Sequence, residues 1–485
     1  MAIINRQHHF PRAPQRGSIA LMAVLALLVI MGFYGMALDL GRLYNRRLEF
    51  DLVARAAVLA AAPQLNGTPA GIDKAVAEAR LAVAGMTYDS NQSRVDWRDD
   101  ALSFGAAPGG DWLGAASART DAAGVCYVQA DTAKLGAPQN SLELLLLRWV
   151  ASALNSVPVA ATAVAGRVGI DADLLAVCAM SNLAAAKRTN PGPPVVDELV
   201  EYGFRRGVGY DLMQLNPNGV AAVSFVINPF ALPGQSGAAT GTAAADVGPY
   251  ACTGQLAIPR LNGGRVAVAQ PFPIEALYRQ LNSRLNQYDN AACAPATAPP
   301  DRNIRSYAYD APAPWMNLRP EQQGALVTTV GGKRWTIADP LPAPAANTAL
   351  QYGVLWAYAR PVPFLSYAAG VEEPAGGYTA LAASDWGVLY APGAPTPKSY
   401  PSGTPYGSSL SAYTQAPAVD QRGIANRRVL RVPLLACPIA AGGAANVLGI
   451  GKFLLTAPAT ETSVYAEFGG MVPEHTLGGN VELYQ

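Results

Sequence analysis

The residues of this chain that could carry out chemistry are few, and they do not form a recognisable catalytic motif. Of three histidines, His8 and His9 stand side by side near the start, and His475 is alone in the long remainder. A Ser-His-Asp or Cys-His site beyond the first residues would depend on His475, whose neighbours Pro473 and Glu474 are typical of a surface turn. The spaced motifs of zinc proteases, serine hydrolases and phosphate-binding loops do not occur in the sequence.

Carboxylates that are close in the sequence are the remaining candidates for catalysis. Two carboxyl groups that face each other across a sugar can hydrolyse a glycosidic bond. Solvated surface charge is the commoner role of such pairs, so we expect no enzyme, no cofactor and no bound metal. A membrane-tethered surface-glycan hydrolase or lectin stays open as an alternative. The pairs are Asp99 with Asp100, Glu198 with Glu201, and Glu372 with Glu373.

The five cysteines favour disulfides over metal binding. None belongs to a C-x-x-C pair, and all of them follow residue 38. Cys252 and Cys293 flank one compact segment and are the preferred pair. Closing a loop of that length would stabilise the fold by ~3–4 kcal/mol on the chain-entropy argument. Such bonds require an oxidising compartment, and the odd count leaves at least one thiol without a partner in the chain.

An apolar run near the amino terminus determines how the rest of the chain is placed. Residues 19–38 carry no charge, and at a helical rise of ~1.5 Å per residue they span ~30 Å, the thickness of a bilayer's hydrocarbon core. Signal-peptide cores are shorter, at ~7–15 apolar residues, and end at a cleavage site that this sequence does not show. We therefore predict a retained transmembrane helix. Its anchor residues are Ile19, Leu21, Leu25, Leu28, Ile30, Phe33 and Leu38.

The helix is predicted to continue beyond the anchor as an amphipathic stem. Residues 17–62 would form one helix of ~70 Å, half in lipid and half projecting. Small side chains at four positions would let another helix approach closely: Gly32, Gly35, Ala37 and Gly41. Apolar residues recur at helical spacing along the projecting half: Leu40, Leu43, Tyr44, Leu48, Leu52, Ala56 and Leu59.

The remainder of the chain predicts an α+β, strand-rich head. We expect helices near residues 72–84 and after Pro273, and strands that include 125–130, 386–390, 429–437 and 463–468. Two subdomains are expected, an α+β one over 63–170 and a strand-rich one over 171–485, after a cytoplasmic tail of residues 1–16. Because the net charge is only +1, nucleic acid is not an expected partner.

The stretches around the anchor resemble a known family. Residues 16–20 read Arg-Gly-Ser-Ile-Ala, residues 35–44 read Gly-Met-Ala-Leu-Asp-Leu-Gly-Arg-Leu-Tyr, and residues 53–62 are rich in alanine. Together they resemble the N-terminal signature of TadE/TadG-like proteins of the tight-adherence (Flp-type) pilus apparatus. Segments 251–254, 281–288, 432–438 and 464–468 resemble parts of the longer, TadG-related members.

The resemblance implies a single-pass bacterial inner-membrane protein whose periplasmic part helps to assemble or anchor an adhesive pilus. The implied partners are the lipid bilayer, other pilus assembly proteins or pilins, and a second copy of the chain. TadE-type minor pilins carry Glu where this chain has Met22, and the Asp-x-Ser-x-Ser metal motif of many TadG proteins is not found here. We therefore expect a non-enzymatic assembly component. The alternative is a pilin-like structural or tip subunit that is processed after Gly17 and enters the fibre.

Overall fold

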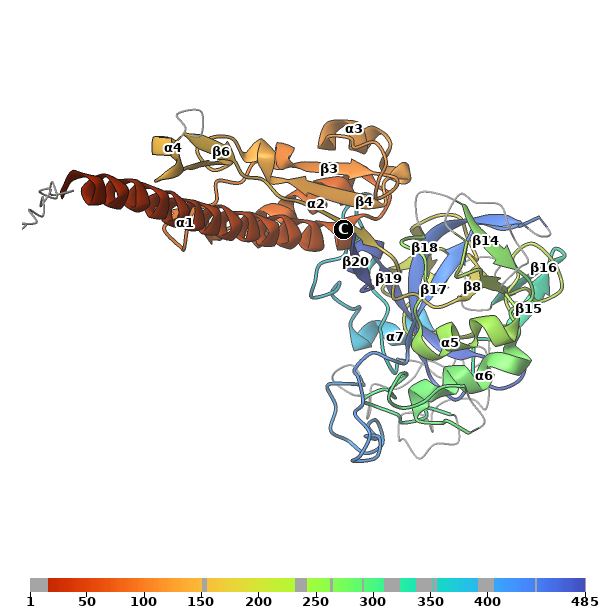
Figure 1. The fold of residues 1–485 in the computed structure, drawn as a ribbon. Coiled ribbons are helices and arrows are strands. Elements are labelled where there is room, and N and C mark those ends of the chain that lie inside the picture. The colour runs from red at the N-terminus through yellow and green to blue at the C-terminus, as the bar shows by residue number, and fades with distance from the viewer. Residues whose placement is uncertain are drawn as a thin grey trace, which may run out of the picture.

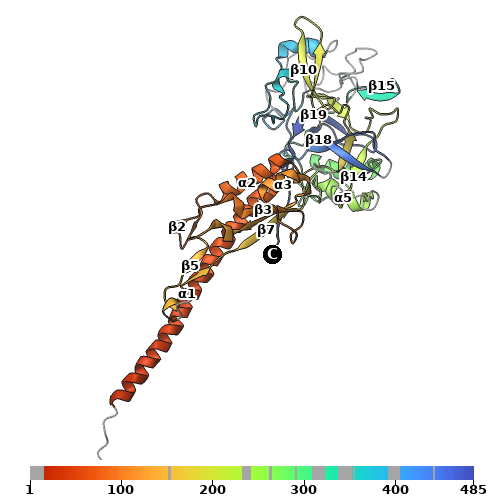
Figure 2. The same cartoon turned by 90° about the horizontal axis from the view of Figure 1, so that it is seen from above.

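The computed structural model describes residues 16–150, 155–231, 242–261, 265–289, 292–308, 323–336, 352, 356–390, 405–440 and 443–484. One long helix projects from a strand-rich, mixed α+β head (Figure 1, Figure 2). The expected cytoplasmic tail lies outside the described residues, apart from Arg16 at the start of the helix.

The projecting helix α1 covers Arg16–Ala61, in close agreement with the predicted helix over 17–62. Its 46 residues are rich in alanine and leucine, which favour helix, and contain no proline. The 3₁₀ turn that follows, Ala62–Gln64, contains Pro63 and ends the helix. The first half of α1 is apolar and exposed, and the helix is long and apolar enough to cross a membrane.

The second half of α1 packs on an antiparallel sheet with the strand order β20-β7-β4-β3. Helix α2 (Pro69–Val83), capped by Thr68, confirms the helix predicted near 72–84 and packs beside α1. One hydrophobic cluster joins α1, α2 and the sheet, and it includes Val53, Ala57, Val76, Leu102 and Val128. The strands are β3 (Leu102–Gly105), β4 (Tyr127–Asp131), β7 (Thr162–Arg167) and β20 (Val481–Tyr484).

Strand β20 comes from the far end of the sequence and pairs with β7. The expected boundaries placed residues 481–484 in the second subdomain, but their pairing puts them in the sheet that lies on the stem. Local sequence signals cannot predict this placement, because the two strands are joined by hydrogen bonds between residues more than three hundred positions apart.

The main sheet of the head has the order β12-β19-β18-β14-β13-β8-β17, and β17 also pairs with β18. The strands from β18 round to β17 therefore form a closed ring. Helices α5 (Ala244–Thr253) and α6 (Ile274–Asn282) lie next to it, and α6 confirms the helix predicted after Pro273 (Figure 1). The strands are β8 (Leu175–Cys178), β12 (Gly209–Asp211), β13 (Phe225–Ile227), β14 (Arg265–Ala269), β17 (Val429–Leu435), β18 (Ala444–Leu455) and β19 (Tyr465–Val472).

A second hydrophobic cluster fills this part of the head, around Phe204, Tyr210, Leu434, Phe453 and Phe468. Residues 386–389, predicted as part of a strand, form instead the short helix α7 (Trp386–Leu389). Trp386 packs on Trp356 and Leu389 is buried. A run of five residues has too few repeats to distinguish strand from helix, so tertiary packing decides.

The remaining described elements are short. Three strands form a meander, β9 (Ala186–Asn190), β10 (Val196–Glu201) and β11 (Phe204–Arg205). Three two-stranded ribbons are β1 (Thr87–Tyr88) with β2 (Ser93–Arg94), β5 (Ser141–Glu143) with β6 (Ser156–Pro158), and β15 (Val327–Val330) with β16 (Lys333–Thr336). Short helices are α3 (Ala115–Thr120) and α4 (Leu147–Val150).

Candidate functional site

Asp39 is the first charged residue after the apolar run, and its side chain is completely buried. Its two carboxylate oxygens accept hydrogen bonds from the backbone N–H groups of Leu145, Leu146 and Leu147, at 2.9, 2.9 and 2.8 Å. These amides lie at the start of α4, where helix geometry leaves N–H groups without partners. Asp39 thus fastens the segment Leu144–Leu147, which we call the leucine loop, to the stem.

The next turns of α1 hold neighbouring loops in the same way. Arg42 donates to the carbonyl of Glu143 at 3.1 Å. Arg46 donates to the carbonyl of Gln139 at 3.2 Å, and its guanidinium lies 4.5 Å from the centre of the Tyr88 ring. Polar residues of α1 therefore bind the part of the head nearest the apolar half of the helix over about two helical turns.

Glu49 continues this series one turn further along α1. Its carboxylate accepts from the backbone N–H groups of Asp89 and Ser90, at 2.8 and 2.9 Å. Both residues have positive φ, 57° and 54°, a conformation that costs energy for residues other than glycine. The hydrogen bonds that Asp89 and Ser90 donate to Glu49 offset that cost and hold the turn between β1 and β2 against the stem.

The four small residues expected to admit a second helix differ in their surroundings. A Cβ built on Gly35 would lie 2.8 Å from the Cβ of Leu146, closer than real Cβ atoms come. Gly35 therefore accommodates the leucine loop of its own chain and not another helix. Around Gly32 and Gly41 a Cβ would meet no atom of the described chain within 4 Å, and Ala37 is exposed.

The head covers a face of the stem other than the one marked by most of the periodic apolar residues. The buried positions of this half of α1 include Arg46, Phe50, Val53 and Ala57. Two apolar faces run along this helix, and periodicity alone cannot tell which of them meets the head. Five of the seven predicted positions lie on the opposite side and are 40–62% exposed; we call them the stem stripe: Leu40, Tyr44, Leu48, Leu52 and Leu59.

The predicted anchor residues are uncovered in the described chain. Leu21, Leu25, Leu28, Ile30, Phe33 and Leu38 are each between 51% and 70% exposed. Ile19 lies in α1, but its side chain is outside the described part. Such exposure of large apolar side chains is costly in water and is the normal condition in lipid.

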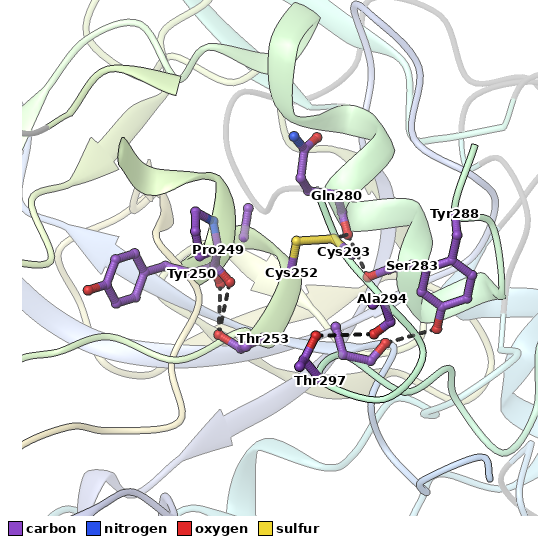
Figure 3. The surroundings of a disulfide bond; sticks show 12 residues. Pro249, Tyr250, Cys252, Thr253, Gln280, Ser283, Tyr288, Cys293, Ala294 and Thr297 are labelled. Atoms are coloured by element: carbon purple, nitrogen blue, oxygen red, sulfur yellow. Dashed lines mark hydrogen bonds between the residues drawn. A yellow bond between two sulfur atoms is a disulfide. The ribbon is translucent and has the colours of Figure 1, made fainter. Parts of the chain in front are cut away.

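Cys252 and Cys293, the pair favoured by the sequence, form a disulfide with their Cα atoms 5.4 Å apart (Figure 3). It joins the end of α5 to the segment that follows α6. A second disulfide, which the sequence did not indicate, links Cys178 at the end of β8 to Cys437 just after β17. These residues are 259 positions apart and come together because β8 and β17 are parallel neighbours. Cys126 is a free thiol.

Five of the six carboxylates considered for catalysis are paired with arginines: Asp99, Asp100, Glu198, Glu201 and Glu373. The Glu198 and Arg205 side chains are fully buried and 2.7 Å apart, and Asp99 and Asp100 pair with Arg80 and Arg98 at the surface. Glu201 and Glu373, which come from two different sequence pairs, meet at one arginine.

Glu201 and Glu373 hold the same guanidinium, that of Arg206, at 2.7 Å each. They also line one cavity of about 230 Å³ with Tyr202 and Tyr378. Burial raises the pKa of Glu373, but the hydrogen bonds and charge of Arg206 outweigh burial, so this pKa lies below its usual value. A general acid for glycoside hydrolysis needs a raised pKa, so this geometry does not support that chemistry.

His475 lies in the turn Glu474–Thr476, and its side chain is outside the described part. Among the residues that the structure describes, no three potential metal ligands gather in one place. Comparison of the chain with protein-family models, with characterised proteins and with solved structures finds no match.

Proposed function

We propose that this protein is a membrane-anchored, non-enzymatic component of a tight-adherence pilus apparatus, with α1 in the bacterial inner membrane and the head in the periplasm. The two disulfides are compatible with an oxidising periplasm. The resemblance of residues 16–62 to TadE/TadG-like proteins supplies the pilus context. In this role the head is presented at a fixed distance from the bilayer, and the stem binds an apolar helix of another assembly protein or pilin.

The stem stripe is the observation that carries this proposal. Its side chains extend the exposed apolar surface of the anchor beyond Leu38, on the side of α1 opposite to the head, and the Asp51–Arg55 ion pair lies among them. Residues four apart on a helix form a ridge of the kind that packs into the groove of a neighbouring helix. Several large apolar side chains that stay exposed along one side of a projecting helix mark an interaction site.

A photo-crosslinking residue placed at Leu48 or Leu52, in the full chain in its native membrane, tests this proposal. We expect crosslinks to a pilin or pilus assembly protein with an apolar helix. The double variant Leu48→Gln/Leu52→Gln should reduce surface fibres about ten-fold or more, since it would remove two central ridge contacts of ~1–2 kcal/mol each. The amount of this variant in the membrane should not change.

The matched control is Leu183→Gln/Leu410→Gln, which alters two head leucines that are 62% and 60% exposed. This control should leave fibre number unchanged. Crosslinks from the stripe to lipid alone, together with normal fibres in the Leu48→Gln/Leu52→Gln variant, would contradict the proposal.

A pilin-like subunit is the second candidate, because the exposed apolar side chains of the anchor and the stem stripe would also suit a helix packed within a fibre. The two roles differ in the mature amino terminus. Mass spectrometry that finds the chain beginning at Ser18 would favour the pilin-like subunit. A retained tail would favour the anchored assembly component.

A further inference from the structure

The leucine loop is the part of the head that lies furthest along α1 towards its amino-terminal half (Figure 1, Figure 2). Its first residue, Leu144, is buried in a cluster with Phe50 of the stem. Leu146 and Leu147 are half-buried, and Leu145 at the tip is 49% exposed. The loop therefore presents apolar side chains at its outer surface while its base is packed.

The position of the loop relative to the apolar run follows from its contacts with α1. The loop amides bind Asp39, the first residue after the run, and the Leu146 side chain reaches Gly35. Gly35 lies three residues inside the run, which is ~5 Å deeper along the helix than Leu38. If residues 19–38 span the bilayer, these leucines lie at the boundary between acyl chains and headgroups.

Charges around the loop fit the same location. Arg42 stands about one turn and Arg47 about two and a half turns beyond the end of the run, and Arg148 follows the loop directly. Arginines at this depth face the phosphate groups of the lipids. The carboxylate of Asp39 would be costly at the edge of the membrane, but three N–H donors satisfy it there.

We propose that the leucine loop is a second membrane contact of this protein, seated in the acyl–headgroup boundary of the exported leaflet. A single helix leaves its head free to tilt and rotate about the helix axis. A second contact, held to the helix by Asp39 and Gly35, fixes which side of the head faces the membrane. The same restraint fixes the direction of the stem stripe, which lies on the opposite side of α1. This inference rests on the proposed membrane span.

Depth measurement in lipid nanodiscs of phosphatidylcholine and phosphatidylglycerol tests the proposal. In full-length Cys126→Ser protein, a single cysteine at Leu145, Leu28 or Val419 carries an environment-sensitive fluorophore. Quenching is measured with iodide in water and with doxyl groups attached near the lipid carbonyls. Leu28 reports the middle of the span, and Val419 is a fully exposed head position.

We expect the label at position 145 to be quenched by doxyl lipid and to be about five-fold less accessible to iodide than the label at 419, because it lies within the interfacial layer. Asp39→Asn removes the charge that holds the loop amides, so it should raise iodide access at position 145 at least two-fold. Asp51→Asn is the matched control, since Asp51 of the same helix pairs with Arg55 four residues away and not with the loop. This control should leave iodide access at position 145 unchanged.

Three results would overturn the inference. If position 145 is as open to iodide as position 419 while position 28 is quenched by lipid, the span stands and the second contact fails. If position 145 is shielded from both quenchers, another protein or a second copy covers the loop in place of lipid. If position 28 itself avoids lipid, the proposed membrane span fails together with this inference.

Discussion

At the scale of single residues, buried carboxylates hold distant loops by accepting several backbone N–H groups at once. Asp39 does this for the leucine loop. Glu467 in β19 does it for Ala357, Tyr358 and Ala359, with distances of 2.7, 2.9 and 2.8 Å. A loop inside the protein needs such acceptors, because its own backbone makes no regular ladder. Donors and acceptor here are more than a hundred residues apart, so no local pattern reveals them.

Glu467 should make stability depend on pH. Burial raises the pKa of Glu467 to about 7 from an ordinary 4.5, while the three N–H donors and Arg360 lower it by less. A raised carboxyl pKa means that the folded state holds the proton more tightly than the unfolded chain. The contribution of Glu467 is therefore complete below about pH 4.5 and is lost as pH rises through about 7, with a total of ~3 kcal/mol.

Melting temperatures of the detergent-solubilised protein between pH 4.5 and 8 measure this effect. Glu467→Gln has no titrating group at this position, so the decline in melting temperature between pH 4.5 and 7 should be smaller in this variant. Glu461→Gln, at an exposed position, should retain the decline of the parent protein. Parallel profiles for the parent and Glu467→Gln would show that Glu467 does not titrate in this range.

At the scale of elements, one disulfide joins two segments outside the sheets and the other reinforces a pair of neighbouring strands. The Cys252–Cys293 bond ties α5 to the chain beyond α6 (Figure 3). Both cysteines lie in a small hydrophobic cluster with Ala298. The Cys178–Cys437 bond links the end of β8 to the residues just after β17, the strand parallel to it. The first bond closes a short loop between adjacent helices, and the second joins halves of the head that are remote in sequence.

Removing the local disulfide should destabilise the head. Cys252→Ser/Cys293→Ser releases a loop of 41 residues, which on the chain-entropy argument costs ~3–4 kcal/mol. Urea unfolding of the head, followed by tryptophan fluorescence, measures the loss. Cys126→Ser removes a thiol that forms no disulfide and should change the free energy of unfolding by ~0.5 kcal/mol or less. Equal midpoints for the double variant and the parent would show that this bond does not stabilise the head.

At the scale of the whole molecule, the chain returns from the head to the stem. Strand β20 adds to the sheet on α1, and two buried arginines support this junction. Arg167 of β7 donates to the carbonyl of Leu477 at 2.7 Å, and Arg260 of the head donates to the carbonyl of Val125 at 2.6 Å. The head is therefore joined to the stem both by the chain that leaves the stem and by the chain that comes back.

Ending the chain after Asn480 tests whether β20 helps to join the head to the stem. The truncation removes four cross-strand pairs with β7, worth ~1–3 kcal/mol in total, and the contact between Tyr127 and Tyr484. Hydrogen exchange of the β7 amides should become faster, while exchange in β17 and β18 stays unchanged. Removal of Gln485 alone is the control and should have no effect. Unaltered β7 exchange in the truncated protein would show that β20 does not support the sheet.

The sequence by itself determined the features that depend on local composition and spacing. The unbroken apolar run and the helical periodicity beyond it predicted the extent of α1, and the spacing of Cys252 and Cys293 around one segment indicated one of the two disulfides. Helices α2 and α6 followed from apolar residues at helical period, and Pro273 indicated where α6 begins. These signals act within a few turns of chain, so they can be read without knowing the fold.

Only the tertiary structure decided the features that depend on remote contacts. Periodicity showed that the stem has an apolar face, but the packing of the head on Phe50 and Val53 left the stem stripe uncovered. Gly35 was expected to contact another helix, but it contacts Leu146 of its own chain. In the sequence Asp39 is only the first charged residue after the apolar run, and its hydrogen bonds to the leucine loop appear only in the fold. A side chain acquires its role from the groups that the fold brings to it, and those groups lie a hundred residues or more away in the sequence.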